Sequence, residues 1–303
     1  MSIIDEKKDK LDPTIWGRSA DGSVVLREEV ARAIRRKTRE LVDGIPVRGA
    51  HLVGSITGYY YSPDSDLDIN LVLDVSDELL LALRDRAKTK VNGQFVPGTK
   101  HPINFFVRNE TPSLSAFDGV YDLKRDVWVK KPTDVGVDLF SIYDDFKQHL
   151  SELDAQIGEA WRSIIDLDKL KESLKYGGSR EIYRKIKERL DDLDDAITSL
   201  VAEYDDVHQK RVEGFERQIE LADRGLSPYP SLNVIPENIR YKVLERYHYV
   251  DFLKKLREVL ESADGKIDTP QEVQDVRETL QMFPNKDHFA YGFITKALGG
   301  LRL

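Results

Sequence analysis

The sequence contains no cysteine, and this absence removes several kinds of chemistry at once. Disulfide bonds, cysteine nucleophiles and thiolate zinc sites are excluded, and the absence fits a reducing compartment. The six histidines are scattered, with no pair at metal-ligand spacing. No apolar run is long enough to cross a bilayer, and the opening MSIIDEKKDK has no apolar core for a signal peptide. We therefore expect a cytoplasmic protein with no membrane partner.

The first half of the chain also lacks an excess of either positive or negative charge. The chain has 303 residues, enough for about two domains, and a formal net charge of −8. Residues 1–137 hold 21 basic and 21 acidic side chains, so the remainder holds 25 basic against 33 acidic. The second half is therefore a poor candidate for a wide nucleic-acid surface. The best local basic patch is REEVARAIRRKTRELV, for which we favour a solvated helix face.

Residues 1–136 show the pattern of a mixed α and β domain. A helix is expected over about 26–42, ending at Asp43-Gly44, and a second in SDELLLALRDRA with Ser76 as its cap. Strands are expected in GAHLVGS, LDINLVLDV and PINFFV, and GVYDLKRDVWVKKP is typical of a hairpin turning at 124–126.

Residues 137–303 instead predict a bundle of long helices. The chain changes in character from about Val137, and apolar residues step by three and four from Tyr143 to Leu174 and again from Ile182 to Val207, with Gly177-Gly178-Ser179 between them. We expect an antiparallel hairpin of two helices, joined by a third helix over about 236–262 that includes Tyr247. A helix of some 37 residues would be about 55 Å long, so pairing with a second copy is an alternative to an ordinary bundle core. The overall expectation is an α+β protein, with a small mixed sheet and flanking helices followed by this bundle.

The stretch HLVGSITGYYYSPDSDLDINLVLD places acids at the start of a strand that is otherwise apolar. Side chains alternate along a strand, so Asp66 and Asp68 share one face, about 6.6 Å apart along the chain. Two like charges at this spacing require a compensating cation. A calcium loop starting at Asp64 is excluded, because Ile69 stands where glycine is needed and Val75 where a bidentate glutamate is needed.

This arrangement resembles the core motif of the DNA polymerase beta-like nucleotidyltransferase superfamily: an apolar strand, Gly54-Ser55, a short helix, then Asp66-Leu67-Asp68 in an adjacent strand. The resemblance covers roughly the first 110 to 135 residues, and the chain looks like predicted nucleotidyltransferases found in phages. It implies that Gly54 and Ser55 hold the phosphates of a nucleoside triphosphate such as ATP. It also implies that Asp66 and Asp68 bind two Mg²⁺ ions, with Mn²⁺ as an alternative.

Three neighbouring features extend this hypothesis. Ser65 is expected to belong to the nucleotide-binding residues and to orient the turn before Asp66 through a bond from its side chain to the backbone. Lys100 is expected either to meet the triphosphate or to face solvent. The tyrosines at 59–61 are expected either to stack on a base or to pack in a turn, and packing is the interpretation we favour.

The chain departs from the family at the third carboxylate, where the matching strand carries Asn104. Asparagine can coordinate a cation through its carbonyl but supplies neither charge nor a base. The side chains that could replace the missing acid are those of His101, Glu110, Asp122 and Asp126, and a strand-edge role is favoured for His101.

Two functions follow from these residues. The first is an enzyme that transfers a nucleoside monophosphate from a nucleoside triphosphate to a hydroxyl, releasing pyrophosphate, with an RNA 3′ end, a small molecule or a protein as acceptor. The second is a nucleotidyltransferase-like domain without catalysis that acts as a nucleotide-binding or assembly module through its helices. Fold alone does not decide between them.

Overall fold

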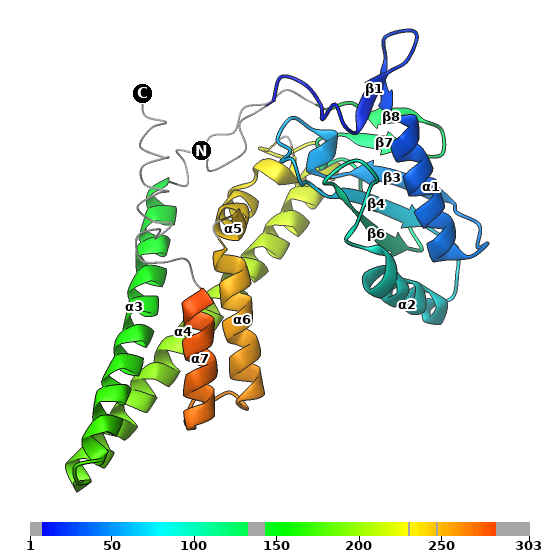
Figure 1. The fold of residues 1–303 in the computed structure, drawn as a ribbon. Helices are drawn as coiled ribbons and strands as arrows, with labels where there is room; N and C mark the ends of the chain where they lie inside the picture. The colour runs from blue at the N-terminus through cyan, green and yellow to red at the C-terminus, as the bar shows by residue number, and fades with distance from the viewer. Residues whose placement is uncertain (1–7, 133–142, 230, 247, 283–303) are drawn as a thin grey trace. The chain divides into compact units, whose positions relative to one another are not determined.

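The protein has a mixed α+β fold, seen in a computed structural model that describes residues 8–132, 143–229, 231–246 and 248–282 (Figure 1). The described residues form two compact units. The sheet unit comprises 8–132 and 215–235, and the helical unit comprises 143–214 and 236–282. The predicted start of the long helices near Val137 and the predicted helical residue Tyr247 lie outside the described residues.

A six-stranded mixed sheet forms the centre of the sheet unit, with strand order β5-β6-β4-β3-β7-β8. The strands are β3 (Gly49–Val53), β4 (Leu67–Val72), β5 (Gln94–Phe95), β6 (Pro102–Arg108), β7 (Val120–Asp122) and β8 (Val127–Lys130). β4 and β6 are parallel, and the other neighbouring pairs are antiparallel. The predicted strands and the hairpin at 124–126 are thereby confirmed.

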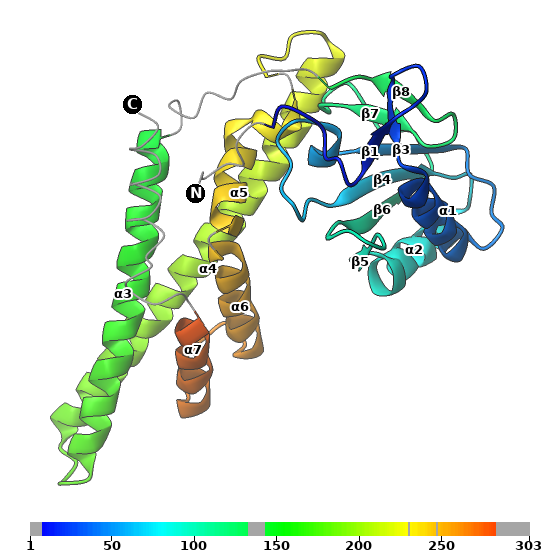
Figure 2. The same ribbon diagram turned by 45° about the horizontal axis from the view of Figure 1, so that its top comes forward.

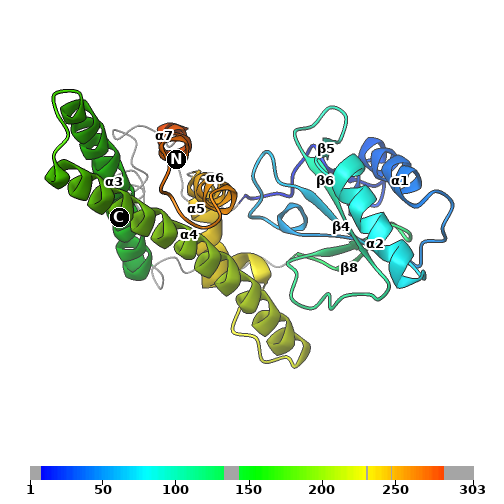
Figure 3. The same ribbon diagram turned by 90° about the horizontal axis from the view of Figure 1, so that it is seen from below.

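Two helices, both expected from the sequence, cover one face of this sheet. They are α1 (Glu28–Val42) and α2 (Asp77–Arg86), and α2 begins at Ser76, whose hydroxyl accepts a bond from the Leu79 amide. Leu52, Ile69 and Phe105 from three adjacent strands join Val30 and Leu83 from the helices in one buried cluster. Because side chains alternate, the next residues along the strands, including Asp68 and Asn104, point to the opposite face. Figure 3 shows β4, β6 and α2 from below.

Three short elements of the sheet unit were not expected from the sequence. β1 (Trp16–Arg18) and β2 (Val24–Leu26) form a separate two-stranded sheet, and the short edge strand is β5. The Trp16 ring stacks on Trp128 of β8 with 4.6 Å between ring centroids, so aromatic packing joins the two sheets. The turn of this hairpin contains Asp21-Gly22, a dipeptide typical of tight hairpins.

Long antiparallel helices form the helical unit. α3 (Tyr143–Leu174) and α4 (Arg180–Asp223) are connected by a turn in which the Ser179 hydroxyl accepts a bond from the Ile182 amide, capping α4. His149 lies 3.4 Å from Glu203, and Arg189 lies 3.6 Å from Asp166, a pairing that fits antiparallel directions. The part of α4 from Phe215 onward belongs to the sheet unit, where Asp223 accepts bonds from Ser113 and Ser115.

The prediction of a single third helix over 236–262 is wrong, because the helix is interrupted within this range. α5 (Pro236–Arg246) and α6 (Tyr249–Ser262) are separate helices, and His248 between them has a left-handed backbone with φ 65°. The apolar repeat runs through the break, so periodicity alone could not reveal it. A further helix, α7 (Pro270–Met282), was not expected, although Thr269 and Glu272 form a reciprocal capping box at its start.

The core of the helical unit is built from residues of the predicted stripes. Those that are fully or almost fully buried within the single chain include Leu153, Ile157 and Ile164 of α3, Leu193, Ile197 and Leu200 of α4, and Leu256 of α6. Val276 of α7, outside the predicted stripes, is also fully buried. Across the described ranges, no helix is both long enough and apolar enough to cross a membrane.

The Asp154 carboxylate of the helical unit makes the free energy of unfolding depend on pH. The Asp154 carboxylate accepts a bond of 2.9 Å from the Tyr249 hydroxyl, and burial raises the pKa of Asp154 to about 6. Between its unfolded pKa of about 4 and this value, the folded state binds more protons than the unfolded state. The free energy of unfolding therefore falls as the pH rises through this window.

We expect Asp154→Asn to stabilise the protein at pH 7.5 by about 1 kcal/mol, because the amide still accepts from Tyr249 and carries no charge. Urea unfolding at pH 4.5 and 7.5 measures the effect, with Glu152→Gln on the exposed side of the same helix as the control. A variant that is less stable than the wild type at pH 7.5, or that keeps the wild-type pH dependence, would contradict this assignment.

Candidate functional site

Asp66, Asp68 and Asn104 meet at the beginning of β4. In the parallel register of β4 and β6, Asp68 lies directly opposite Asn104. The Asn104 amide Nδ2 donates a hydrogen bond of 2.6 Å to Asp66 Oδ2. The three side chains therefore occupy one face of the sheet, opposite the face covered by α1 and α2. Each side chain is partly buried, so it packs against the protein on one side and remains accessible to solvent on the other.

The Gly54-Ser55 corner lies against Asp68. β3 ends at Val53, which pairs with Asp68 across the antiparallel register, and the chain then turns into the short 3₁₀ helix η1 (Ser55–Thr57). Gly54 has φ 88° and ψ −169°, a conformation essentially restricted to glycine. A Cβ at this position would lie 2.6 Å from Asp68 Oδ2. The predicted phosphate-binding corner and the second predicted metal ligand are thus in direct contact.

Ser65 connects the loop before β4 to the same corner. Its hydroxyl accepts a bond of 2.8 Å from the Ser62 amide, and its Oγ lies 3.1 Å from the Ser55 Oγ. The first contact is the bond from side chain to backbone that the sequence suggested. The second places two predicted nucleotide-binding hydroxyls side by side, next to Asp66.

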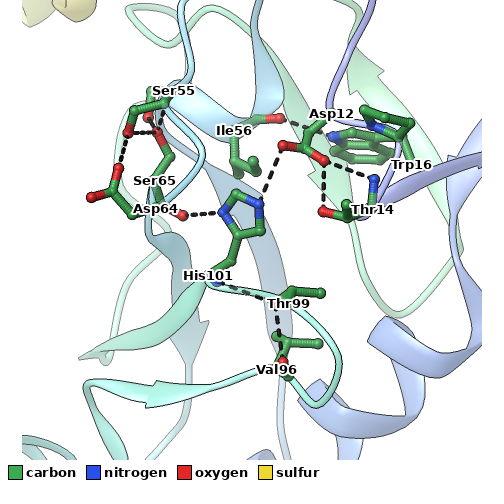
Figure 4. Close-up of polar contacts among 12 residues, drawn as sticks. Asp12, Thr14, Trp16, Ser55, Ile56, Asp64, Ser65, Val96, Thr99 and His101 are labelled. Carbon is green, nitrogen blue, oxygen red and sulfur yellow. Dashed lines mark hydrogen bonds and ion pairs between the residues drawn. The ribbon is translucent and has the colours of Figure 1, made fainter.

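Sequence reasoning missed most of the support for this loop. The His101 ring is buried between two partners: Nδ1 lies 2.7 Å from the Ser65 carbonyl oxygen, and Nε2 lies 3.2 Å from Asp12 Oδ2 (Figure 4). Asp12 is itself buried, and its other oxygen accepts bonds from the amide and hydroxyl of Thr14. Both ring nitrogens are engaged, so His101 holds the backbone immediately before Asp66 rather than replacing the missing carboxylate.

The other candidates for the missing acid are Glu110, Asp122 and Asp126, and each has neighbours other than Asp66 and Asp68. Glu110 and Asp122 line a cavity of about 640 Å³ together with Arg48, His51 and Arg125. Asp122 pairs with His51 on β3, two residues from the level of Asp68. Asp126 accepts a bond of 2.8 Å from the Tyr121 hydroxyl in the β7–β8 hairpin.

The two remaining predictions at the nucleotide site have different outcomes. Lys100 is exposed just before β6 and makes no hydrogen bond or ion pair with other described residues. Tyr61 belongs to the buried core cluster, where burial raises the pKa of its hydroxyl, so this tyrosine packs rather than stacks on a base. Tyr59 and Tyr60 are partly buried.

The donor set suits a hard cation, but it does not form a complete cage. Within the described ranges, no group of three or more histidine, aspartate or glutamate side chains is arranged to hold a metal ion. Asp66 and Asp68 supply carboxylate oxygens, and Asn104 supplies one amide oxygen. Mg²⁺ is commonly bound by one or two carboxylates together with substrate phosphates and water. The residues present therefore fit a metal ion whose remaining ligands come from outside the protein.

Comparison of the chain with models of protein families, with curated proteins and with solved structures found no match.

The contact between Gly54 and Asp68 leads to a stability test. We expect Gly54→Ala to lower the free energy of unfolding by about 1–3 kcal/mol, because it adds both backbone strain and a clash with the carboxylate. Gly22→Ala is the matched control, since Gly22 also has a positive φ of 84° but a Cβ there would meet nothing within 4 Å. Urea unfolding measures both variants, and equal losses would show that the Asp68 contact adds nothing.

Proposed function

We propose that the chain is a metal-dependent nucleotidyltransferase that moves a nucleoside monophosphate from a nucleoside triphosphate to a hydroxyl acceptor. The acceptor classes are an RNA 3′ end, a small molecule and a protein side chain. The proposal extends the resemblance of residues 54–68 to the DNA polymerase beta-like nucleotidyltransferases.

The observation that supports it most is the contact between the Gly54 backbone and the Asp68 carboxylate. A triphosphate bound at the Gly54-Ser55 corner would lie beside both aspartates, because Asp66 and Asp68 flank the same asparagine. Gly54-Ser55 and Asp66-Leu67-Asp68 are separated by ten residues in the sequence, and the pairing of β3 with β4 brings them together.

Each residue has a distinct expected task. The backbone at Gly54 has no side chain to obstruct a phosphate, and the hydroxyls of Ser55 and Ser65, which are hydrogen-bonded to each other, would turn toward its oxygens. Asp66 and Asp68 would hold Mg²⁺, which when bound neutralises charge on the attacking and leaving oxygens. The acceptor oxygen forms a bond to the α-phosphorus, the bridging bond to the β-phosphate breaks, and pyrophosphate leaves. The acceptor proton passes to water, since Asn104 is not a base.

One observation favours a second function, a domain that binds nucleotide without transferring it. Asn104 donates its amide to Asp66 at 2.6 Å, so the position expected to carry a third negative charge supplies a hydrogen-bond donor. This hydrogen bond gives the Asp66 carboxylate a partner that is not a metal ion.

A labelling experiment separates the two functions. The protein is incubated with α-labelled nucleoside triphosphates, Mg²⁺ or Mn²⁺, and an RNA oligonucleotide, an aminoglycoside or no added acceptor, and pyrophosphate release is followed together with label transfer. We expect transfer in the wild type and a loss of about a hundredfold or more in Asp66→Asn and Asp68→Asn, because each removes a metal-binding charge.

Asp64→Asn is the matched control, since Asp64 is exposed in the same loop and its carboxylate accepts only from the Ser62 hydroxyl among the described residues. We expect it to retain wild-type activity. Thermal stabilisation by nucleotide and metal with no label transferred would favour the binding domain. Label transfer that survives in Asp68→Asn would contradict the proposed site.

A further inference from the structure

The turn of the helical hairpin concentrates positive charge within the acidic half of the chain. Residues 169–189 contain eight lysine and arginine residues against three glutamates. Outside this segment, residues 138–303 contain 17 basic and 30 acidic residues. We call residues 169–189 the basic tip. The positive charge is confined to one turn and the adjoining ends of α3 and α4. The net charge of residues 138–303 as a whole therefore does not reveal it.

The basic tip presents two tyrosines to solvent. Tyr176 is 90% exposed and Tyr183 is 61% exposed, whereas tyrosine is usually intermediate in burial. A Cβ on Gly178 would lie 3.1 Å from both the ring edge and the hydroxyl of Tyr183, so the glycine turn lies directly against this ring. In Figure 2 the turn lies at the free end of the helical unit, beyond the ends of α6 and α7.

Some of the positive charge in the basic tip is already paired. Lys175, Arg184 and Lys185 each form an ion pair with a glutamate three or four residues away. Lys169 and Arg189 pair with aspartates in the adjoining helix segments. Three exposed cations, Lys171, Arg180 and Lys187, have no such partner among the described residues.

We propose that the basic tip binds single-stranded nucleic acid, with Lys171, Arg180 and Lys187 contacting phosphates and with bases stacking on Tyr176 and Tyr183. Cations interleaved with exposed aromatic rings are the chemistry that recognises a flexible strand, because every base has a face that can stack. A lipid surface fits less well. Membrane-bound helices bury a continuous apolar face, whereas here Leu174, Ile182 and Ile186 are partly buried in the helical unit.

Fluorescence anisotropy of a labelled twelve-nucleotide uridine oligomer with the full chain tests the proposal at 50 and 200 mM salt. We expect Lys171→Glu/Arg180→Glu/Lys187→Glu to weaken binding at least about tenfold, and to make the slope of log K against log salt shallower by about 2, as loss of three phosphate contacts requires. Tyr176→Ala/Tyr183→Ala should weaken binding by about fivefold or more with little change in slope.

The matched control is Arg32→Glu/Arg35→Glu/Arg36→Glu on α1, which changes the net charge by the same amount at exposed positions in the other basic patch. Circular dichroism checks that each variant folds. Equal losses in both triple variants, no binding by the wild type, or tighter binding to anionic vesicles than to the oligomer would each overturn the proposal. It does not depend on nucleotidyl transfer, because oligomer binding is measured without nucleoside triphosphate or divalent metal ion.

Discussion

The contact between the Gly54 backbone and the Asp68 carboxylate is the constraint on which the rest of the site depends. Val53 and Asp68 are paired across β3 and β4, so the chain must leave β3 directly beside the carboxylate. A side chain at Gly54 would approach an Asp68 oxygen to 2.6 Å, and the backbone there has the extended, positive-φ geometry that glycine tolerates. A glycine at this point lets the loop of the proposed phosphate site lie beside the proposed metal ligand Asp68.

The sheet supplies the remaining geometry. The parallel pairing of β4 with β6 brings Asn104 level with Asp68, and the bond from Asn104 to Asp66 fixes the first acid on the same face. The covered face holds the apolar core, and the opposite face carries the polar residues of the site. His101 and Asp12 then hold the Ser65 backbone from outside the sheet. The positions of Asp66, Asp68 and Asn104 are therefore set by strands β3, β4 and β6 and by the buried contacts of His101 with Asp12 and Ser65.

Local signals in the sequence were sufficient for much of this arrangement. Ser76 predicts where α2 begins, and alternation predicts that Asp66 and Asp68 share a face, because both effects act over a few residues. The Asp12–His101 contact joins residues 89 positions apart, and neither residue carries a local mark of its partner. The break between α5 and α6 depends on one left-handed residue, His248, within an uninterrupted apolar repeat. The capping box at Thr269 was a readable signal for α7.

In the proposed site, Asp66 and Asp68 bind a divalent ion together with a triphosphate held at Gly54 and Ser55. Electron paramagnetic resonance of Mn²⁺ titrated into the protein, with and without a non-hydrolysable nucleoside triphosphate analogue, tests it most directly. We expect protein-bound Mn²⁺ that increases strongly with the analogue and disappears in Asp66→Ala/Asp68→Ala. Equal binding of Mn²⁺ and analogue by the wild type and this double variant would contradict it.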